Sequence, residues 1–117
     1  VKTSNPQDVE NDLNQLLKEY KKLDKITIED IIHFHVLFER IHPFSDGNGR
    51  VGRMIMFREC LRNDIMPFII LDKNKDYYIK GLKEYDRDSK YLIDTCLYAQ
   101  DIYESVSNQL LDFEIDE

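Results

Sequence analysis

Apolar side chains recur every three or four residues along most of this 117-residue chain, and no other feature constrains the fold as much. This interval is the spacing of one face of an α-helix, and it differs from the alternation of a half-buried strand. Short polar breaks separate the helical stretches, which favours an all-α, compact bundle of about five helices. The stretches span about 6–20, 27–41, 48–61, 75–85 and 89–112.

Local signals define several helix ends and inner faces. Asn5-Pro6 is typical of a helix start, Thr27 and Asp30 form a capping-box pattern, and Pro43 ends the second stretch. Residues 67–71 are predicted to form a loop packed on the core. The expected inward positions are Val51, Met54, Ile55 and Leu61 in the third stretch and Leu92, Cys96, Ala99, Tyr103, Val106 and Leu110 in the last.

The overall charge excludes several classes of protein. A formal net charge of −7 opposes general binding to nucleic acid or to an anionic membrane surface. No apolar run has the length of a membrane span. Cys60 and Cys96 are too few for a disulfide framework and lack metal-ligand spacing. We therefore expect a reducing, cytoplasmic setting.

The arginines have an uneven distribution in this acidic chain. Five of the six lie between residues 40 and 62, where only Asp46 and Glu59 carry negative charge. The planar fork of donors in arginine suits phosphate groups. An ordinary solvated helix face is the alternative interpretation of the same pattern.

Residues 42–53 interrupt the helical pattern and carry the residues with chemical potential. Gly47, Asn48 and Gly49 tolerate positive φ, so their backbone amides can converge on an anion at the start of the next helix. Arg50 and Arg53 are three residues apart on that helix and are expected to reach the same anion. Together these features indicate a di- or triphosphate site.

The remaining candidates surround this phosphate site. Asp46 is the candidate ligand for Mg²⁺, although an Asx-turn or helix cap would explain it without a metal. His42 can accept a proton near pH 7 and so activate a hydroxyl. Phe44 is expected to turn inward and support the loop. His33 and His35 are interpreted as structural, with a zinc site from His35, His42 and Asp46 as a weaker alternative.

The segment from His42 to Arg53 resembles the signature of the Fic (FIDO) family, His-Pro-Phe-x-(Asp/Glu)-Gly-Asn-Gly-Arg-x-x-Arg, at every fixed position. The resemblance implies a single Fic-like domain over residues 1–117, with a helical core at about 6–112. It also implies transfer of AMP from Mg-ATP to a Ser, Thr or Tyr hydroxyl of a target protein. The donor is then ATP and the metal Mg²⁺.

The resemblance assigns a role to each motif residue. His42 is the implied general base, Asp46 the implied Mg²⁺ ligand, and Phe44 the support beneath the loop. The implied phosphate-binding residues are Gly47, Asn48, Gly49, Arg50 and Arg53. Tyr77 and Tyr78 fall where some relatives place adenine-contacting residues, and packing is an equal explanation for them.

Two family features are missing from the sequence. No hairpin signal precedes His42, so the flap that clamps the target segment in many relatives is expected upstream of Val1. No Ser or Thr is followed by Glu four residues later, which is the pattern of the inhibitory helix that pairs with the last motif arginine. Inhibition would then come from upstream residues or from a partner protein such as an antitoxin, or be absent.

Other functions remain open at this stage. The same loop is compatible with removal of AMP, or with transfer of another phosphate-linked group such as UMP or phosphocholine. A non-catalytic module that binds nucleotide or a partner protein is a further alternative. The intact Gly47-Asn48-Gly49 argues against the Doc-type kinase branch, whose loop contains lysine.

Overall fold

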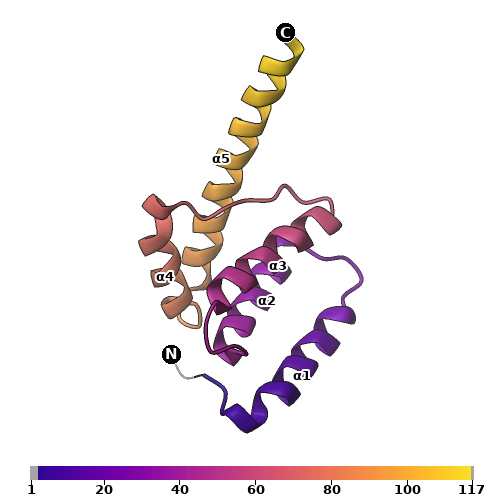
Figure 1. Cartoon of the computed structure of the whole chain (residues 1–117), viewed down its shortest axis with the longest axis vertical. Helices are drawn as coiled ribbons and strands as arrows, with labels where there is room; N and C mark the ends of the chain where they lie inside the picture. The colour runs from indigo at the N-terminus through magenta and orange to yellow at the C-terminus, as the bar shows by residue number, and fades with distance from the viewer. Residues whose placement is uncertain (1–2, 117) are drawn as a thin grey trace. The chain divides into compact units, whose positions relative to one another are not determined.

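A computed structural model of the chain describes residues 3–116, with side chains described to residue 112, and all regular secondary structure in this part of the chain is helical (Figure 1). The all-α fold predicted from the sequence is therefore confirmed. None of the described helices is long and apolar enough to cross a membrane. The elements are the 3-10 turn η1 (Pro6–Asp8), α1 (Val9–Lys21), α2 (Ile28–Ile41), α3 (Asn48–Arg62), the 3-10 turn η2 (Asp72–Asn74), α4 (Lys75–Glu84) and α5 (Ser89–Asp116).

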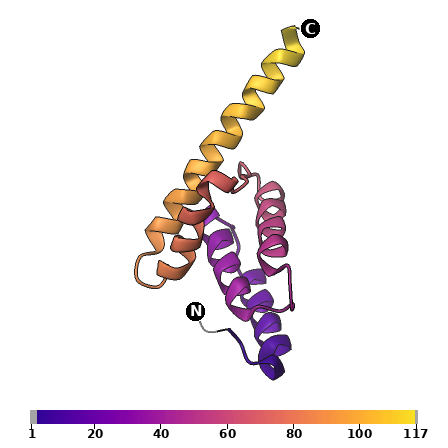
Figure 2. The ribbon, with the colours of Figure 1, turned by 60° about the vertical axis from the view of Figure 1, so that its left-hand side comes forward.

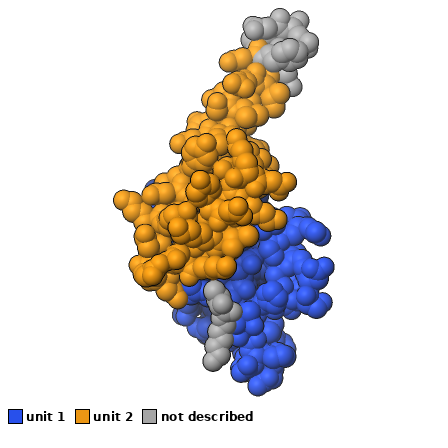
Figure 3. Space-filling view, turned by 90° about the vertical axis from the view of Figure 1, so that its left-hand side faces the viewer, with its two compact units in different colours: residues 1–65 blue, residues 66–117 orange. Residues whose placement is uncertain are grey.

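The chain divides into two compact units, residues 1–65 and residues 66–117, which are coloured separately in Figure 3. The first unit contains α1, α2 and α3, and the second contains α4 and α5. The segment from His42 to Arg53 lies wholly within the first unit, so this unit contains every predicted motif residue.

In the first unit, α2 packs against both α1 and α3 (Figure 2). The predicted capping box begins α2: the Asp30 N–H donates to Thr27 Oγ1 at 3.2 Å, and the Thr27 N–H donates to Asp30 Oδ2 at 2.9 Å. The core cluster comes from α1 and α2, with Val51 and Ile55 of α3 packed against it; its buried members are Leu16, Phe34, Phe38 and Ile41. The two helices that flank the loop at residues 42–47, α2 and α3, are thereby held together by apolar packing.

A buried polar contact ties α1 to the far end of α3. The Tyr20 hydroxyl donates to Glu59 Oε1 at 2.9 Å, and Glu59 also pairs with Arg58 and Arg62 at 3.4 and 3.5 Å. Burial, followed by the hydrogen bond to Glu59, raises the pKa of Tyr20, which keeps the hydroxyl as a donor at neutral pH. Glu59 is thus buried with partners rather than isolated.

The inner face of α3 differs from the sequence prediction. Met54 is 65% exposed and Leu61 is 57% exposed, although both were expected to face the core. The fully buried residues of α3 are the first helical residue, Asn48, followed by Gly52, Met56, Glu59 and Cys60. Val51 and Ile55, also predicted to face inward, are half-buried and pack against the core cluster. Hydrophobic periodicity is therefore right at two of the four positions, and the small Gly52 and the paired Glu59 occupy the rest of the buried face.

In the second unit, α4 and α5 pack side by side, and α5 continues well beyond α4 (Figures 1 and 2). Asp88 caps α5, because the Lys90 N–H donates to Asp88 Oδ1 at 3.2 Å. Residues 67–71 form no regular element, as predicted, and Phe68 is buried.

The long stripe of α5 is buried only at its start. Leu92, Cys96 and Ala99 are buried as predicted. Val106 and Leu110 are 49% and 62% exposed, so the prediction that the stripe stays buried to residue 110 is wrong. The reason is geometric: these two positions lie on the part of α5 that extends past α4.

Replacing Gly81 with alanine is expected to destabilise the second unit by about 1–3 kcal/mol, the usual cost of overpacking. A Cβ at Gly81 would lie 2.9 Å from both Cα and Cβ of Leu92, so the clash involves the backbone of α5. Urea unfolding followed by circular dichroism measures the change, with exposed Lys83→Ala on the same helix as control. A Gly81→Ala protein as stable as the parent would show that α4 and α5 can separate without cost.

Candidate active site

His42 occupies a strained backbone position at the end of α2. Its φ and ψ are 56° and 59°, in the left-handed region that few residues other than glycine adopt. Its N–H still donates to the Phe38 carbonyl at 3.1 Å, which closes the helix. The side chain is exposed. The turn of the backbone therefore leaves the imidazole accessible to solvent at the first residue of the loop.

Asn48 holds the loop between α2 and α3 in shape. Its side chain is buried and makes two hydrogen bonds with one residue: the Phe44 N–H donates to Asn48 Oδ1 at 2.9 Å, and Asn48 Nδ2 donates to the Phe44 carbonyl at 2.7 Å. The carboxamide thereby satisfies two backbone groups of the loop that would otherwise lack a partner. The sequence identified Asn48 as a phosphate ligand and gave no sign of this second task.

The Phe44 side chain contradicts the sequence prediction. It is 48% exposed in place of turning into the core. The Asn48 carboxamide takes the inner side of the loop and binds the Phe44 backbone, so the ring is directed outward. The Phe44 backbone, through its N–H and carbonyl, is the part of this residue that binds Asn48.

The start of α3 has the features of an anion site. Gly47, at φ 80°, is the residue before the helix, and the first turn closes with a hydrogen bond from the Val51 N–H to the Gly47 carbonyl at 3.0 Å. No acceptor among residues 3–116 is recorded for the amides of Asn48, Gly49 and Arg50. Helix N-termini carry such unused donors and a partial positive charge, both of which favour anions.

Arg53 lies close to this first turn. A Cβ placed at Gly49 would be 2.9 Å from Arg53 Nη1, so the end of the Arg53 side chain lies against the backbone of the first turn of α3. Arg50, one turn earlier on α3, is exposed. The structure thus brings one guanidinium next to the amides of the helix start and leaves the other open to solvent.

Metal ligands are sparse around the loop. Asp46 is exposed, and the described residues contain no group of three or more His, Cys, Asp or Glu side chains that could hold a metal ion. The zinc alternative from His35, His42 and Asp46 is therefore excluded, since His35 is buried within α2. A single carboxylate fits Mg²⁺, which takes one or two protein ligands together with phosphate oxygens and water.

Two ionisable residues lie behind the loop: His35, which the sequence connects with the site only through the zinc alternative, and Glu39, which it does not connect with the site. Burial lowers the pKa of His35 to about 4, and the charge of Arg53 acts in the same direction, while a hydrogen bond with the Gly52 backbone opposes them. Burial raises the pKa of Glu39, and the charges of Arg53 and His42 oppose that shift. Glu39 precedes His42 by three residues, but an acid inside an apolar helix gave no functional signal.

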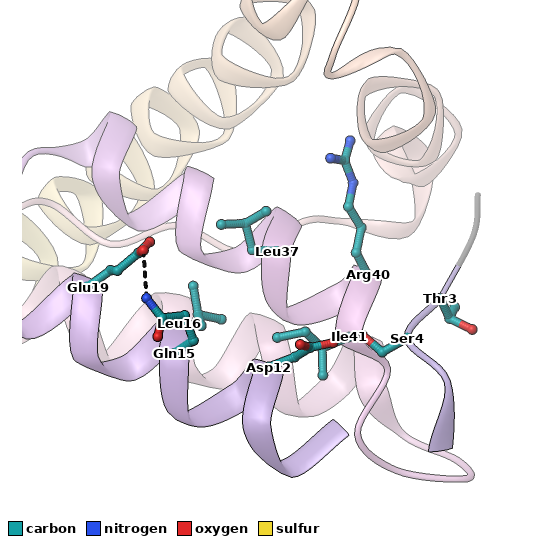
Figure 4. Close-up of a pocket in the computed structure, with 9 residues that line it drawn as sticks. All are labelled: Thr3, Ser4, Asp12, Gln15, Leu16, Glu19, Leu37, Arg40 and Ile41. Atoms are coloured by element: carbon teal, nitrogen blue, oxygen red, sulfur yellow. Dashed lines mark hydrogen bonds between the residues drawn. The ribbon is translucent and has the colours of Figure 1, made fainter. Parts of the chain in front are cut away.

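The first unit also contains a cavity of about 380 Å³ beside α1 and α2 (Figure 4). The Ser4 hydroxyl donates to Asp12 Oδ2 at its edge, and Gln15 donates to Glu19. No residue from His42 to Arg53 lines it. Its wall contains the carboxylates of Asp12 and Glu19 against the single guanidinium of Arg40, so the charged groups sum to a negative charge that disfavours a polyphosphate.

Tyr77 and Tyr78 differ in their surroundings within the second unit. Tyr78 is buried, whereas Tyr77 is exposed and lines a separate pocket with Tyr91 and Tyr98. The packing interpretation holds for Tyr78. Neither residue is assigned to the site here.

The sequence model of the Fic/DOC family matches residues 1–60, which include the whole segment from His42 to Arg53. The chain belongs to the Fic/DOC family. A probable protein adenylyltransferase of Aquifex aeolicus is 40% identical over 68 residues, covering 58% of this chain and 20% of that protein. The protein adenylyltransferase Fic of Nematostella vectensis is 34% identical over 79 residues, covering 62% and 18%.

One match has a different name. The ribonucleoside-diphosphate reductase small chain of Ostreid herpesvirus 1 is 33% identical over 78 residues, covering 67% of this chain and 12% of that protein. The chain spans about a fifth or less of the length of these three relatives.

Replacing Asn48 with alanine is expected to lower stability by about 1–3 kcal/mol, because two backbone groups of Phe44 lose their partner, and to weaken the Mg-ATP binding that the resemblance implies about tenfold or more. Calorimetry and thermal unfolding measure the two effects. The matched control is Asn63→Ala, which removes a similar hydrogen bond, from Asn63 Nδ2 to the Glu59 carbonyl, at the other end of α3. Equal affinities in the two variants would refute a role for Asn48 in shaping the loop.

Proposed function

We propose that this protein transfers AMP from Mg-ATP to a Ser, Thr or Tyr hydroxyl of a target protein. The observation that carries the proposal is the exposed His42 at one end of a loop whose other end offers the unused amides of Asn48, Gly49 and Arg50. The imidazole of His42, a possible proton acceptor, and the first free amide, that of Asn48, which could bind phosphate, are thus six residues apart in the chain.

In the proposed reaction His42 removes the proton from the target hydroxyl. The hydroxyl oxygen forms a bond to the α-phosphorus of ATP, the bond from that phosphorus to the bridging oxygen breaks, and diphosphate leaves. The amides after Gly47 and the guanidiniums of Arg50 and Arg53 bind the departing phosphates and offset their charge. Catalysis of this kind depends on positioning and on charge neutralisation more than on covalent chemistry.

Asp46 is the residue that would hold Mg²⁺. Its carboxylate is exposed beside the amides that receive the phosphates, where two negative groups would repel each other without a cation between them. Mg²⁺, when bound, neutralises phosphate charge and orients the leaving group. We also propose that the target and any inhibitory partner are proteins of the cell interior, and that residues 6–112 form the core of one Fic domain.

The proposal is tested by offering the full chain ATP labelled at the α- or the γ-phosphate, together with a protein extract. Transfer of AMP labels protein from α-labelled ATP alone and only with Mg²⁺. Label from γ-labelled ATP would instead indicate phosphorylation. Label from UTP or from a choline-linked donor at equal ATP binding would favour a related group transfer.

A matched measurement separates the enzyme from a binding module. If calorimetry shows that the folded chain binds Mg-ATP but no donor labels any protein, the catalytic proposal fails and a nucleotide-binding role stands. Release of AMP from a previously modified protein would identify the reverse activity.

A further inference from the structure

Glu39 places a buried carboxylate behind the loop. Its Oε1 atom is buried and accepts no hydrogen bond from the part of the chain that the structure describes. Removing a carboxylate oxygen from water without a donor is costly, and a charge in such a place calls for an opposite charge nearby. Nothing in the sequence pattern of α2 requires an acid at this position.

The glycines of α3 locate this carboxylate. A Cβ at Gly52 would lie 3.0 Å from Glu39 Oε1, and a Cβ at Gly49 would lie 3.7 Å from the same atom. The Glu39 carboxylate therefore lies close to the backbone of the first turns of α3, at Gly49 and Gly52. The N-terminus of α3, whose free amides could bind an anion, therefore has the Glu39 carboxylate beside it.

Arg53 shares the same space. The Cβ position of Gly49 that is 3.7 Å from Glu39 Oε1 is also 2.9 Å from Arg53 Nη1. Carboxylate and guanidinium thus lie on one side of α3, next to the same glycine. The pKa of Glu39 reflects the charge of Arg53, which opposes the effect of burial. The two charges are therefore close enough to influence each other.

The long side chain of arginine needs a constraint to stay in one place. Arg53 lies one turn after Gly49, so its side chain runs back along α3 toward the helix start. A fixed carboxylate beside that path favours the arrangement in which the guanidinium lies over the first turn. His35 is also buried against Gly52, and its lowered pKa keeps the imidazole neutral at neutral pH. It therefore does not compete with Arg53 as a cation for the Glu39 carboxylate.

We propose that Glu39 is a positioning residue that holds the Arg53 guanidinium over Gly49, beside the amides at the start of α3. The placement of Arg53 is independent of any ligand. The consequence for phosphate binding rests on the function proposed above, and it follows because the guanidinium is already in place when the anion arrives.

The first test follows Arg53 itself in the nucleotide-free full chain. The Nε–Hε resonance of Arg53 is assigned by its loss in Arg53→Lys. Glu39→Gln, which keeps the shape and removes the charge, should shift and broaden this resonance, whereas Glu29→Gln on the exposed side of α2 should leave it unchanged. An unchanged resonance in folded Glu39→Gln would overturn the proposal.

The second test measures Mg-ATP affinity by calorimetry. Glu39→Gln should weaken binding about tenfold, and Glu39→Asp should restore part of the loss. In an Arg53→Ala background Glu39→Gln should have no further effect. Tighter binding by Glu39→Gln would mean that Glu39 competes with phosphate for Arg53, and additive losses would mean that the residues act separately; either result refutes positioning.

The two tests also separate this inference from the proposed function. If the parent chain binds no Mg-ATP while the Arg53 resonance responds to Glu39→Gln, the nucleotide proposal fails and the placement of Arg53 by Glu39 stands. Circular dichroism of each variant shows whether it is folded, so loss of structure is not mistaken for loss of positioning.

Discussion

Replacing His42 is expected to lower AMP incorporation at least ~100-fold, the scale on which removal of a general base acts. His42 is exposed at the start of the loop and is the base of the proposed reaction. Affinity for Mg-ATP should change little, because the phosphates are assigned to the amides of α3 and to the arginines. The effect therefore belongs to the chemical step and not to binding.

The choice of replacement matters because His42 has a left-handed backbone. Alanine is disfavoured there by roughly 1–2 kcal/mol, whereas asparagine tolerates the same angles. Label from α-labelled ATP is compared among His42→Ala, His42→Asn and His33→Ala, the last being an exposed histidine of the same helix. Full labelling by a folded His42→Asn protein would remove His42 from the role of base.

Acidification is expected to cost the folded chain about 3 kcal/mol through His35 alone. The pKa of His35 falls from 6.5 to about 4 on folding, chiefly because burial disfavours the charged imidazole. Between these values the unfolded chain binds a proton that the folded chain does not. The contribution to stability is therefore complete above pH 6.5 and is lost as the pH falls toward 4.

Urea unfolding at several pH values measures this loss, with His35→Gln as the reference protein. Glu39 acts in the opposite sense: its pKa is raised on folding, so its contribution is present at low pH and lost as the pH rises. The charge of Arg53 does not vary in this range. Because both proteins contain Glu39 and Arg53, the difference between their pH profiles isolates His35.

A direct titration keeps this prediction testable if His35→Gln does not fold. The imidazole C–H resonance of His35 in the parent chain should titrate near pH 4. A titration midpoint near 6.5 would show that the His35 ring is hydrated in solution, and that its protonation does not change the free energy of unfolding.

Features that depend on neighbouring residues in the sequence could be predicted. The capping box of Thr27 and Asp30 and the turn after Pro43 follow from local side-chain and backbone chemistry. The helices on either side of that turn, α2 and α3, form where expected. The motif from His42 to Arg53 can be recognised in the sequence alone, and the catalytic and ligand roles of its residues stay predictions.

Features that depend on packing could not be predicted in the same way. The arginines and methionines of α3 give no clear apolar face, so the close approach at Gly52 decides which side is buried. The outward ring of Phe44 follows from a carboxamide of Asn48 that binds backbone groups on the far side of the loop. The position of Glu39 beside Arg53 requires knowledge of how α2 and α3 cross.

The contact between Asn48 and Phe44 has a consequence for how fast and how tightly a ligand binds. A loop closed on its own backbone has already lost its conformational entropy during folding, so capture of a ligand orders few additional bonds. Binding should accordingly resemble entry into a preorganised receptor, with an association rate set by diffusion and orientation and independent of any slow rearrangement.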